Sequence, residues 1–167
     1  TKVIDEDELA PQPIIRAAIR FLKRNPPPPP LRLHVVHGDY RTGNFLYDKE
    51  GNVRGILDWE LAHVGDPHED LAWMCTKTWR FGNPGAPVGG VGPREPFYSA
   101  YEAESGYRLD RDALRWWEVL CSAKVCVVWI VQVNAYLSGI IPSVEQAAIG
   151  RRMAETELDL LQRLEDA

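Results

Sequence analysis

The sequence predicts an α+β domain that is mostly helical, with a small β-element in its N-terminal third. Apolar residues recur at helical spacing near the N-terminus and over most of the chain after residue 95. Between residues 33 and 57 they instead form short runs bounded by turn residues, which is typical of strands. The 167 residues, 45% hydrophobic and 26% charged, are enough for a buried core, so we expect residues 1–167 to form a single domain.

The first predicted helix spans residues 13–24, where four apolar residues share one face. Five prolines follow at residues 26–30. A run of this length forms a stiff extended rod. We interpret it as a spacer that delivers the chain to the first strand; a docking motif for a proline-binding module is the less favoured alternative.

Three short strands are expected next, at residues 33–37, 44–47 and 53–57. The sequence DKEGN at residues 48–52 supplies a turn between the second and the third. Asp66 can cap a helix that begins near Pro67.

Beyond residue 81 the pattern changes to an irregular loop and then to helices. Residues 82–96 hold five Gly and four Pro and predict the loop. Helices are expected at about 95–104, 110–137 and 143–165, the last opening with the capping-box spacing of Ser143 and Gln146. Polar residues and a proline interrupt the uncharged run 125–144, so a buried core helix is favoured over a membrane span of about 20 apolar residues. The six tryptophans are interpreted mostly as core.

Charge and cysteine content narrow the function classes. Lys and Arg number 19 against 24 for Asp and Glu, a net charge of −5 that argues against a protein built to hold nucleic acid. The three cysteines lack metal-binding or disulfide spacing, which favours a reduced, cytoplasmic protein. The acidic residues 5–8 do not resemble a secretory signal. We therefore expect neither nucleic acid nor a membrane as a partner.

Three polar residues stand where the predicted strands begin or end. Asp39 follows the first strand, Asn44 begins the second, and Asp58 follows the third after a hairpin-sized turn that would bring it beside Asn44. Amide and carboxylate oxygens side by side suit Mg²⁺ that holds phosphate oxygens. A nearby carboxylate that accepts a hydroxyl proton completes the groups needed for phosphoryl transfer, where positioning and charge neutralisation dominate.

This pattern resembles a known family. The sequence HGDYRTGN at residues 37–44, then ILDWE at 56–60, GDP at 65–67 and DLA at 70–72, is similar to the aminoglycoside phosphotransferase family of the kinase-like superfamily. The resemblance runs from about Pro13 to the C-terminal helices, and its specificity lies in the combination of motifs. It implies the C-terminal lobe of a protein-kinase-like fold, with a small hairpin element carrying the catalytic loop. The implied reaction transfers the γ-phosphoryl group of ATP, or of another nucleoside triphosphate, with Mg²⁺, to the hydroxyl of a small molecule.

The resemblance also implies roles for the reacting groups. Asp39 would be the catalytic base or would orient the hydroxyl, and Asn44 and Asp58 would hold Mg²⁺ against the nucleotide phosphates. Arg41 would stabilise the transferring phosphoryl group or is a surface charge.

Three further residues are expected to support the site. His37 would pack beneath the loop and fix its backbone, and Asp70 would be a buried anchor that accepts hydrogen bonds from loop amides. Glu60 is either close to the metal or structural, and the sequence leaves these two open.

Kinases of this superfamily have a second, N-terminal lobe with a Gly-rich loop and a strand lysine. Only 36 residues precede His37, they lack that pattern, and the chain begins with Thr1. We therefore expect a C-terminal lobe without its N-terminal partner, whose activity alone is doubtful. The glycine-rich residues 89–92 follow the catalytic segment and are expected to shape the acceptor side.

Two other functions are compatible with parts of the sequence. The chain could be a non-catalytic interaction module that reuses the fold, with residues 26–30 as its docking segment, but the intact Asp39, Asn44 and Asp58 argue against this. A metal-dependent hydrolase is the remote alternative, because His34 and His37 lie near Asp39. The two histidines would point to opposite faces of a strand, which disfavours a shared metal. The sequence does not identify the acceptor.

Overall fold

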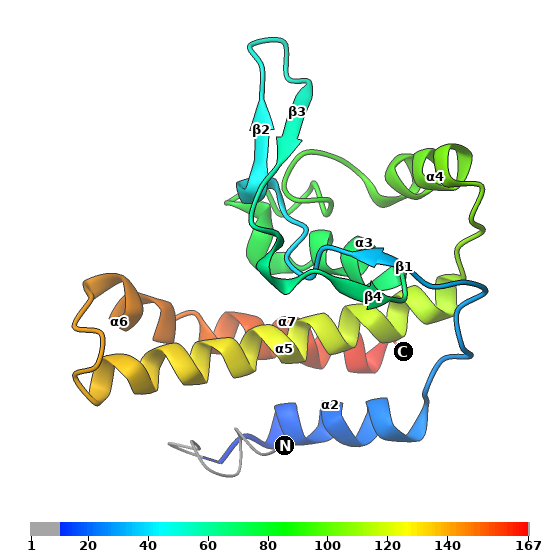
Figure 1. Ribbon diagram of the computed structural model, residues 1–167. Coiled ribbons are helices and arrows are strands. Elements are labelled where there is room, and N and C mark those ends of the chain that lie inside the picture. The colour runs from blue at the N-terminus through cyan, green and yellow to red at the C-terminus, as the bar shows by residue number, and fades with distance from the viewer. Residues whose placement is uncertain (1–10, 167) are drawn as a thin grey trace. The chain divides into compact units, whose positions relative to one another are not determined.

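The computed structural model describes residues 11–166, which form two compact units (Figure 1). The helical unit comprises residues 11–26 and 119–166, and the site unit comprises residues 27–118. The boundary between residues 26 and 27 falls inside the proline run that the sequence analysis interpreted as a spacer. The acidic residues 5–8 lie outside the described residues.

The helical unit contains α2 (Pro13–Arg24), the C-terminal part of α5 (Arg111–Leu137), α6 (Val144–Gly150) and α7 (Met153–Glu165). The predicted bounds of the first helix are confirmed, and α2 packs along α7. Two hydrogen bonds inside this unit join α5 to α7. Ser122 donates to Asp159 at 3.1 Å, and the indole Nε1 of Trp129 donates to Thr156 at 3.1 Å. These buried polar groups are thus satisfied within the protein, which removes the cost of burying them.

Among the described residues, α5 alone is long and apolar enough to cross a membrane by length and composition. In its most apolar stretch, 44% of the residues are buried within the protein. Core helices of water-soluble proteins have the same length and composition, so the helix by itself does not indicate a membrane span.

The predicted single helix over residues 143–165 is wrong, because α6 ends at Gly150 and α7 begins at Met153. A Cβ at Gly150 would lie 2.6 Å from Cγ2 of Val133, so close packing requires glycine there, and glycine weakens a helix by about 1 kcal/mol. Ser143 caps α6 by accepting from the amide of Glu145 at 3.2 Å. The reciprocal bond of a capping box is absent among the described residues, where Gln146 Oε1 has no partner.

The site unit holds two antiparallel two-stranded sheets. In one, β2 (Phe45–Tyr47) pairs with β3 (Val53–Ile56) as the hairpin expected from the turn residues. In the other, β1 (His34–Val36) pairs with β4 (His63–Gly65), a strand that the sequence did not predict. Three residues carry too little alternation to signal a strand.

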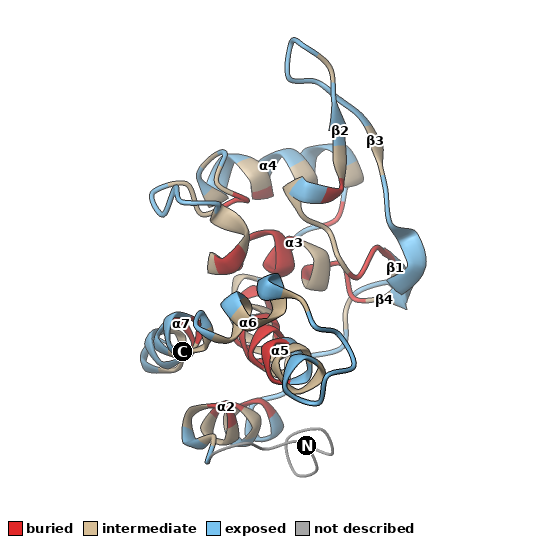
Figure 2. Cartoon of the chain, turned by 90° about the vertical axis from the view of Figure 1, so that its left-hand side faces the viewer, coloured by how far each residue is buried: buried red, intermediate tan, exposed pale blue. Residues whose placement is uncertain are grey.

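The core of the site unit forms around α3 (His68–Met74), which Figure 2 shows as largely buried. The helix α4 (Arg94–Ser105) and the start of α5 pack with it. Short 3₁₀ helices η1 (Thr42–Asn44), η2 (Trp59–Leu61) and η3 (Lys77–Arg80) link these elements. The buried cluster consists of Leu71, Met74, Cys75, Val88, Tyr98, Tyr107, Leu109 and Leu114.

The N-cap of α3 is Pro67 and not Asp66 as the sequence predicted, but the Asp66 side chain still holds the start of the helix. One of its oxygens accepts from the amide and the Nδ1 of His68, and the other accepts from Nε1 of Trp117 at 3.1 Å. The other ring nitrogen of His68 accepts from the amide of Asp110 at 3.0 Å, which ties the start of α5 to α3.

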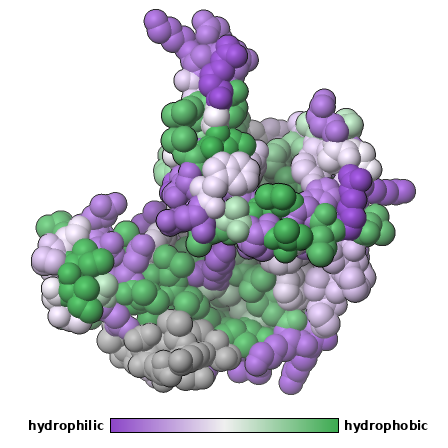
Figure 3. Space-filling model, in the orientation of Figure 1, coloured by the Kyte–Doolittle hydropathy of each residue, from purple (hydrophilic) through white to green (hydrophobic). Residues whose placement is uncertain are grey.

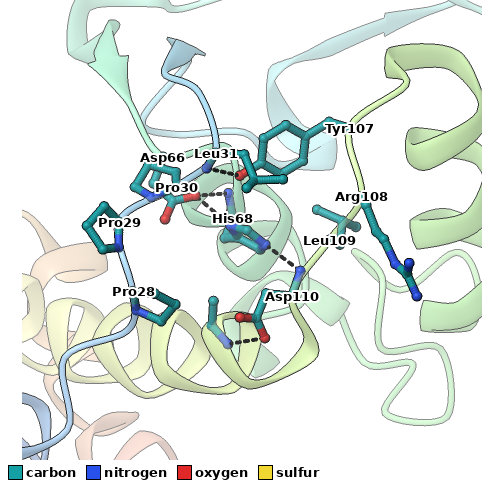
Figure 4. A pocket seen from close by; sticks show the side chains of 11 residues that line it. Pro28, Pro29, Pro30, Leu31, Asp66, His68, Tyr107, Arg108, Leu109 and Asp110 are labelled. Carbon is teal, nitrogen blue, oxygen red and sulfur yellow. Dashed lines mark hydrogen bonds and ion pairs between the residues drawn. The ribbon is translucent and has the colours of Figure 1, made fainter.

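The prolines form one wall of a cavity beside this anchor. Residues 28–30 line a space of about 330 Å³ opposite His68 and Asp110 (Figure 4). The amide of Leu31 donates to the hydroxyl of Tyr107 at 3.2 Å, which fastens the end of the proline segment to the site unit.

Candidate active site

Asp39 lies three residues after β1, and three side chains hold its carboxylate. Oδ2 accepts from Nε of Arg41 at 3.0 Å and from Nδ2 of Asn44 at 2.8 Å, while Oδ1 accepts from Nε1 of Trp73 at 2.7 Å. A carboxylate offers about four lone-pair positions, so about one acceptor position is left. The side chain of Asp39 is 16% exposed and can be reached from solvent.

Asn44 is buried at the end of η1 and is oriented by two hydrogen bonds. Its Nδ2 donates to the carboxylate of Asp39 and also to the backbone oxygen of Asp39, at 2.9 Å. Both bonds use the amide nitrogen, so Oδ1 is the end turned to other partners, and it accepts no hydrogen bond from a described residue. An amide oxygen held in this way is a suitable ligand for a hard cation.

The β2–β3 hairpin places the backbone segment that precedes Asp58 beside Asn44. Phe45 pairs with Ile56, and the amide of Leu57 donates to the backbone oxygen of Asn44 at 2.8 Å. Asp58 follows directly, with an exposed side chain that forms no hydrogen bond or ion pair with another described residue. The sequence predicted from a hairpin-sized turn that Asp58 lies near Asn44. Backbone pairing in the hairpin is what brings the two segments together.

Asp58 adopts the left-handed conformation, with φ 67° and ψ 55°. Only two non-glycine residues in the described part of the chain have a positive φ. This conformation costs roughly 1 kcal/mol, less for Asp and Asn than for other residues, and such strain concentrates at functional sites. The free carboxylate of Asp58 follows a backbone segment paired with Asn44, and carboxylate and amide oxygens are both ligand types of divalent cations.

His37 connects the loop of Asp39 to the segment before Asp58. Its ring is buried; Nδ1 accepts from the amide of Asp39 at 3.2 Å, so Nε2 carries the proton and donates to the backbone oxygen of Leu57 at 2.8 Å. The ring also lies 4.6 Å from the ring of Trp59. The His37 ring therefore joins the loop of Asp39 to the segment that precedes Asp58.

Asp70, in the first turn of α3, holds the same loop from the other side. Its two carboxylate oxygens accept from the amides of His37 at 2.6 Å and Gly38 at 2.9 Å. Burial raises the pKa of the Asp70 carboxyl, although the two amide bonds oppose the shift. Gly38 is required where it stands, because its φ is +84° and a Cβ there would lie 2.7 Å from the backbone oxygen of Leu61.

Arg41 is an oriented group of the site rather than a free surface charge. Besides its bond to Asp39, its guanidinium lies 5.0 Å from the ring centre of Trp79. The rings of Trp79 and Trp73 are 5.4 Å apart, so the two indoles form one wall beside Asp39. The sequence analysis assigned both tryptophans to the core and missed these contacts. The only sequence feature that could indicate them is that tryptophan carries an NH donor and a flat aromatic face.

The glycine-rich loop lies against the catalytic loop. The hydroxyl of Thr42 donates to the backbone oxygen of Gly89 at 3.4 Å, and the amide of Gly89 donates to Met74. A Cβ at Gly89 would meet Thr42 at 2.7 Å, and one at Gly90 would meet the backbone oxygen of Arg80 at 2.5 Å. Glycine is therefore needed for this close approach.

Glu60 and the remaining histidines are not brought into this group. Glu60 is exposed and makes no hydrogen bond or ion pair with another described residue. His34 binds Tyr101 and Arg32, while His63 binds Glu69. Across residues 11–166, no three His, Cys, Asp or Glu side chains are placed to hold a metal together.

Comparison with known proteins adds a family and a fold. The profile of the Phosphotransferase enzyme family matches residues 3–117. A crystal structure from Ralstonia eutropha JMP134, classified as an aminoglycoside phosphotransferase, superposes with a TM-score of 0.81 at 20% sequence identity. It covers 99% of this chain and 53% of its own, and at that identity it shows the fold alone.

Curated relatives match over short segments. Acyl-CoA dehydrogenase family member 10 of mouse is 44% identical over 45 residues, covering 26% of this chain and 4% of its own length. Acyl-CoA dehydrogenase family member 11 of human is 36% identical over 61 residues, covering 36% and 8%. The uncharacterized protein YcbJ of Bacillus subtilis is 40% identical over 42 residues, covering 25% and 14%. This chain thus spans a small part of those relatives.

Proposed function

The chain belongs to the phosphotransferase enzyme family, and on that basis we propose that it serves the transfer of the γ-phosphoryl group of ATP to the hydroxyl of a small molecule. The observation that carries the proposal is the Asp39 carboxylate. Three donors fix its position, and about one acceptor position is left for an incoming hydroxyl.

In this proposal Asp39 receives the hydroxyl proton as the substrate oxygen bonds to the γ-phosphorus, while the bond from that phosphorus to the β–γ bridging oxygen breaks and ADP leaves. Fixed donors cost no reorganisation during the step, which is where positioning lowers a barrier. Arg41, held between Asp39 and Trp79, is placed to neutralise negative charge that develops on the transferring group.

The free oxygens of Asn44 and Asp58 support Mg²⁺ as the ion of this site. Bound there, Mg²⁺ would neutralise phosphate charge; the protein's part is to present one amide and one carboxylate oxygen on adjacent backbone segments. His37 and Asp70 hold those segments, and the loop at residues 89–92 would border the acceptor.

We further propose that the described units form one lobe of a two-lobed enzyme. The similar crystal structure is about twice as long, since 53% of it is covered. Apolar side chains of the hairpin remain exposed next to Asp58, among them Leu46 (50%) and Leu57 (48%). A second lobe with the remaining nucleotide contacts would cover such a surface. The three cysteines are buried and form no disulfide with one another, which supports the cytoplasm as the compartment.

The test is phosphoryl transfer detected by ³¹P NMR, with ATP, Mg²⁺ and a panel of hydroxyl compounds. It uses this chain and a longer protein in which a nucleotide-binding lobe precedes it. We expect a phosphate monoester signal from the longer protein that falls at least a thousandfold in Asp39→Asn. Asp112→Asn, an exposed carboxylate on α5, is the matched control. Transfer that survives Asp39→Asn would contradict the assigned role and favour the interaction module.

A further inference from the structure

A second cavity of the site unit lies behind the catalytic loop, on the side of Asp70. It has a volume of about 210 Å³, and no donor or acceptor of the phosphoryl-transfer site other than His37 and Asp70 contributes to its lining. Strand β1, the catalytic loop, η2, α3 and α4 all contribute to its walls. The cavity is therefore built from five elements of one unit rather than from a single surface depression.

Aromatic rings dominate the lining. Tyr40 comes from the catalytic loop, Trp59 from η2, and Phe97 and Tyr101 from α4. The remaining walls are the apolar residues Val35, Pro67 and Leu71. Ring faces carry partial negative charge, so rings that turn their faces to a bound group favour a cation.

The one charged group in the lining is the carboxylate of Asp70. Each oxygen accepts a single backbone amide, which leaves an acceptor position on each. No Lys or Arg among residues 11–166 forms an ion pair with it. Burial raises the pKa of Tyr40, and the charge of Asp70 adds to this effect.

From these contacts we infer that the cavity is a binding site for a small organic monocation of the alkylammonium type, with the four rings facing its methyl or methylene groups and Asp70 supplying the opposite charge. A metal ion does not fit, because only one carboxylate is present and the rings offer no ligand oxygens in the required number. An anion is excluded by the charge of Asp70 and by the ring faces.

The site is connected to the catalytic loop. Asp70 and His37 line the cavity, and the same two residues hold Gly38, Asp39 and the backbone before Asp58. A cation next to Asp70 stabilises its ionised form and so the two amide bonds to that form. Binding therefore orders the loop that carries Asp39, which makes the cavity an effector site.

The experiment is a titration of the ¹⁵N-labelled chain with tetramethylammonium chloride, followed through the amide signals of His37 and Gly38. Sodium chloride at equal ionic strength and tert-butyl alcohol, a neutral molecule of similar shape, serve as the reference titrations. We expect saturable shifts of the two amides with tetramethylammonium alone. Absence of saturation, or equal shifts with the alcohol, would overturn the inference, because the cavity would then be apolar without preference for charge.

Two variants at Tyr101 distinguish the contribution of the aromatic ring to cation binding from that of side-chain volume. Tyr101→Leu removes a ring and keeps an apolar side chain, so affinity for tetramethylammonium should fall roughly tenfold, whereas Tyr101→Phe keeps the ring and should bind as the parent does. Equal affinity of the Leu and Phe variants would contradict a cation site. This experiment measures cation binding in the absence of nucleotide. A negative result therefore leaves the proposed phosphoryl transfer unaffected, and failure of the proposed phosphoryl transfer leaves the cation site unaffected.

Discussion

The position of Asp39 depends on single side-chain hydrogen bonds, and Trp73 supplies the one that sequence reasoning missed. Trp73→Phe keeps the apolar ring and loses the 2.7 Å bond from Nε1 to Oδ1. A hydrogen bond to a charged group contributes about 1.5–3 kcal/mol, so kcat/KM in the longer protein should fall about ten- to a hundredfold.

Trp117→Phe is the matched control, since its Nε1 donates to Asp66 and not to Asp39. It should lower thermal stability and leave kcat/KM of the folded protein unchanged. Equal losses of kcat/KM in the two variants would show that Trp73 acts on stability alone.

Backbone conformation at Asp58 leads to a second prediction at this scale. Alanine tolerates the left-handed region poorly, so Asp58→Ala should be less stable than Asp58→Gly by about 1 kcal/mol in urea unfolding. Asp58→Asn should fold as well as the parent, because Asn tolerates this conformation. The affinity of the Asp58→Asn variant for Mn²⁺, followed by electron paramagnetic resonance, should be at least tenfold weaker than that of the parent. Equal stabilities of the Ala and Gly variants would show that the positive φ carries no strain.

At the scale of elements, local features were predictable and distant contacts were not. The hairpin and the approach of Asp58 to Asn44 follow from a short turn, so spacing alone indicated them. The pairing of β1 with β4 and the hydrogen bond from Trp73 to Asp39 join segments that are distant in sequence, and no periodicity encodes them. The break after Gly150 depends on a single contact with Val133, which sequence alone does not reveal.

The joint between α3 and α5 has a predictable pH dependence. Burial alone would raise the pKa of the Asp66 carboxyl, but the hydrogen bonds from His68 and Trp117 outweigh it, and the pKa lies below its ordinary value. A lowered carboxyl pKa contributes stability that is complete above the unfolded value of about 3.9 and is lost as pH falls through the folded value. Asp66→Asn should therefore unfold about 1–3 kcal/mol more easily at pH 7, with a smaller difference at pH 3.

Urea unfolding of both proteins at the two pH values measures this difference. Asp112→Asn, whose side chain is 85% exposed, should show little difference at either pH. A gap between parent and Asp66→Asn that is as large at pH 3 as at pH 7 would mean that packing, and not the ionised carboxylate, maintains the joint.

The chain as a whole presents a reactive site next to an uncovered apolar surface. Figure 3 shows hydrophobic surface along the β2–β3 hairpin below its hydrophilic tip. Leu46 and Val53 there are each 50% exposed, and Trp59 beyond the hairpin is 49% exposed. Single exposed apolar residues are ordinary, whereas a group of them beside a candidate metal ligand such as Asp58 indicates a surface that binds a partner.

The affinity for nucleotide distinguishes a lobe that binds nucleotide by itself from a lobe that supplies only half of the nucleotide cleft. Asn44 and Asp58 offer two oxygens to Mg²⁺, and most of the coordination of a bound Mg–nucleotide would come from water and phosphate. We expect titration calorimetry of this chain with Mg-ATP to give weak or undetectable binding, and the longer protein to bind at least a hundredfold more tightly. Asp58→Asn should weaken the longer protein, and Asp112→Asn should not. Tight binding by this chain alone, abolished by Asp58→Asn, would show that one lobe suffices and that the exposed hairpin surface serves another purpose.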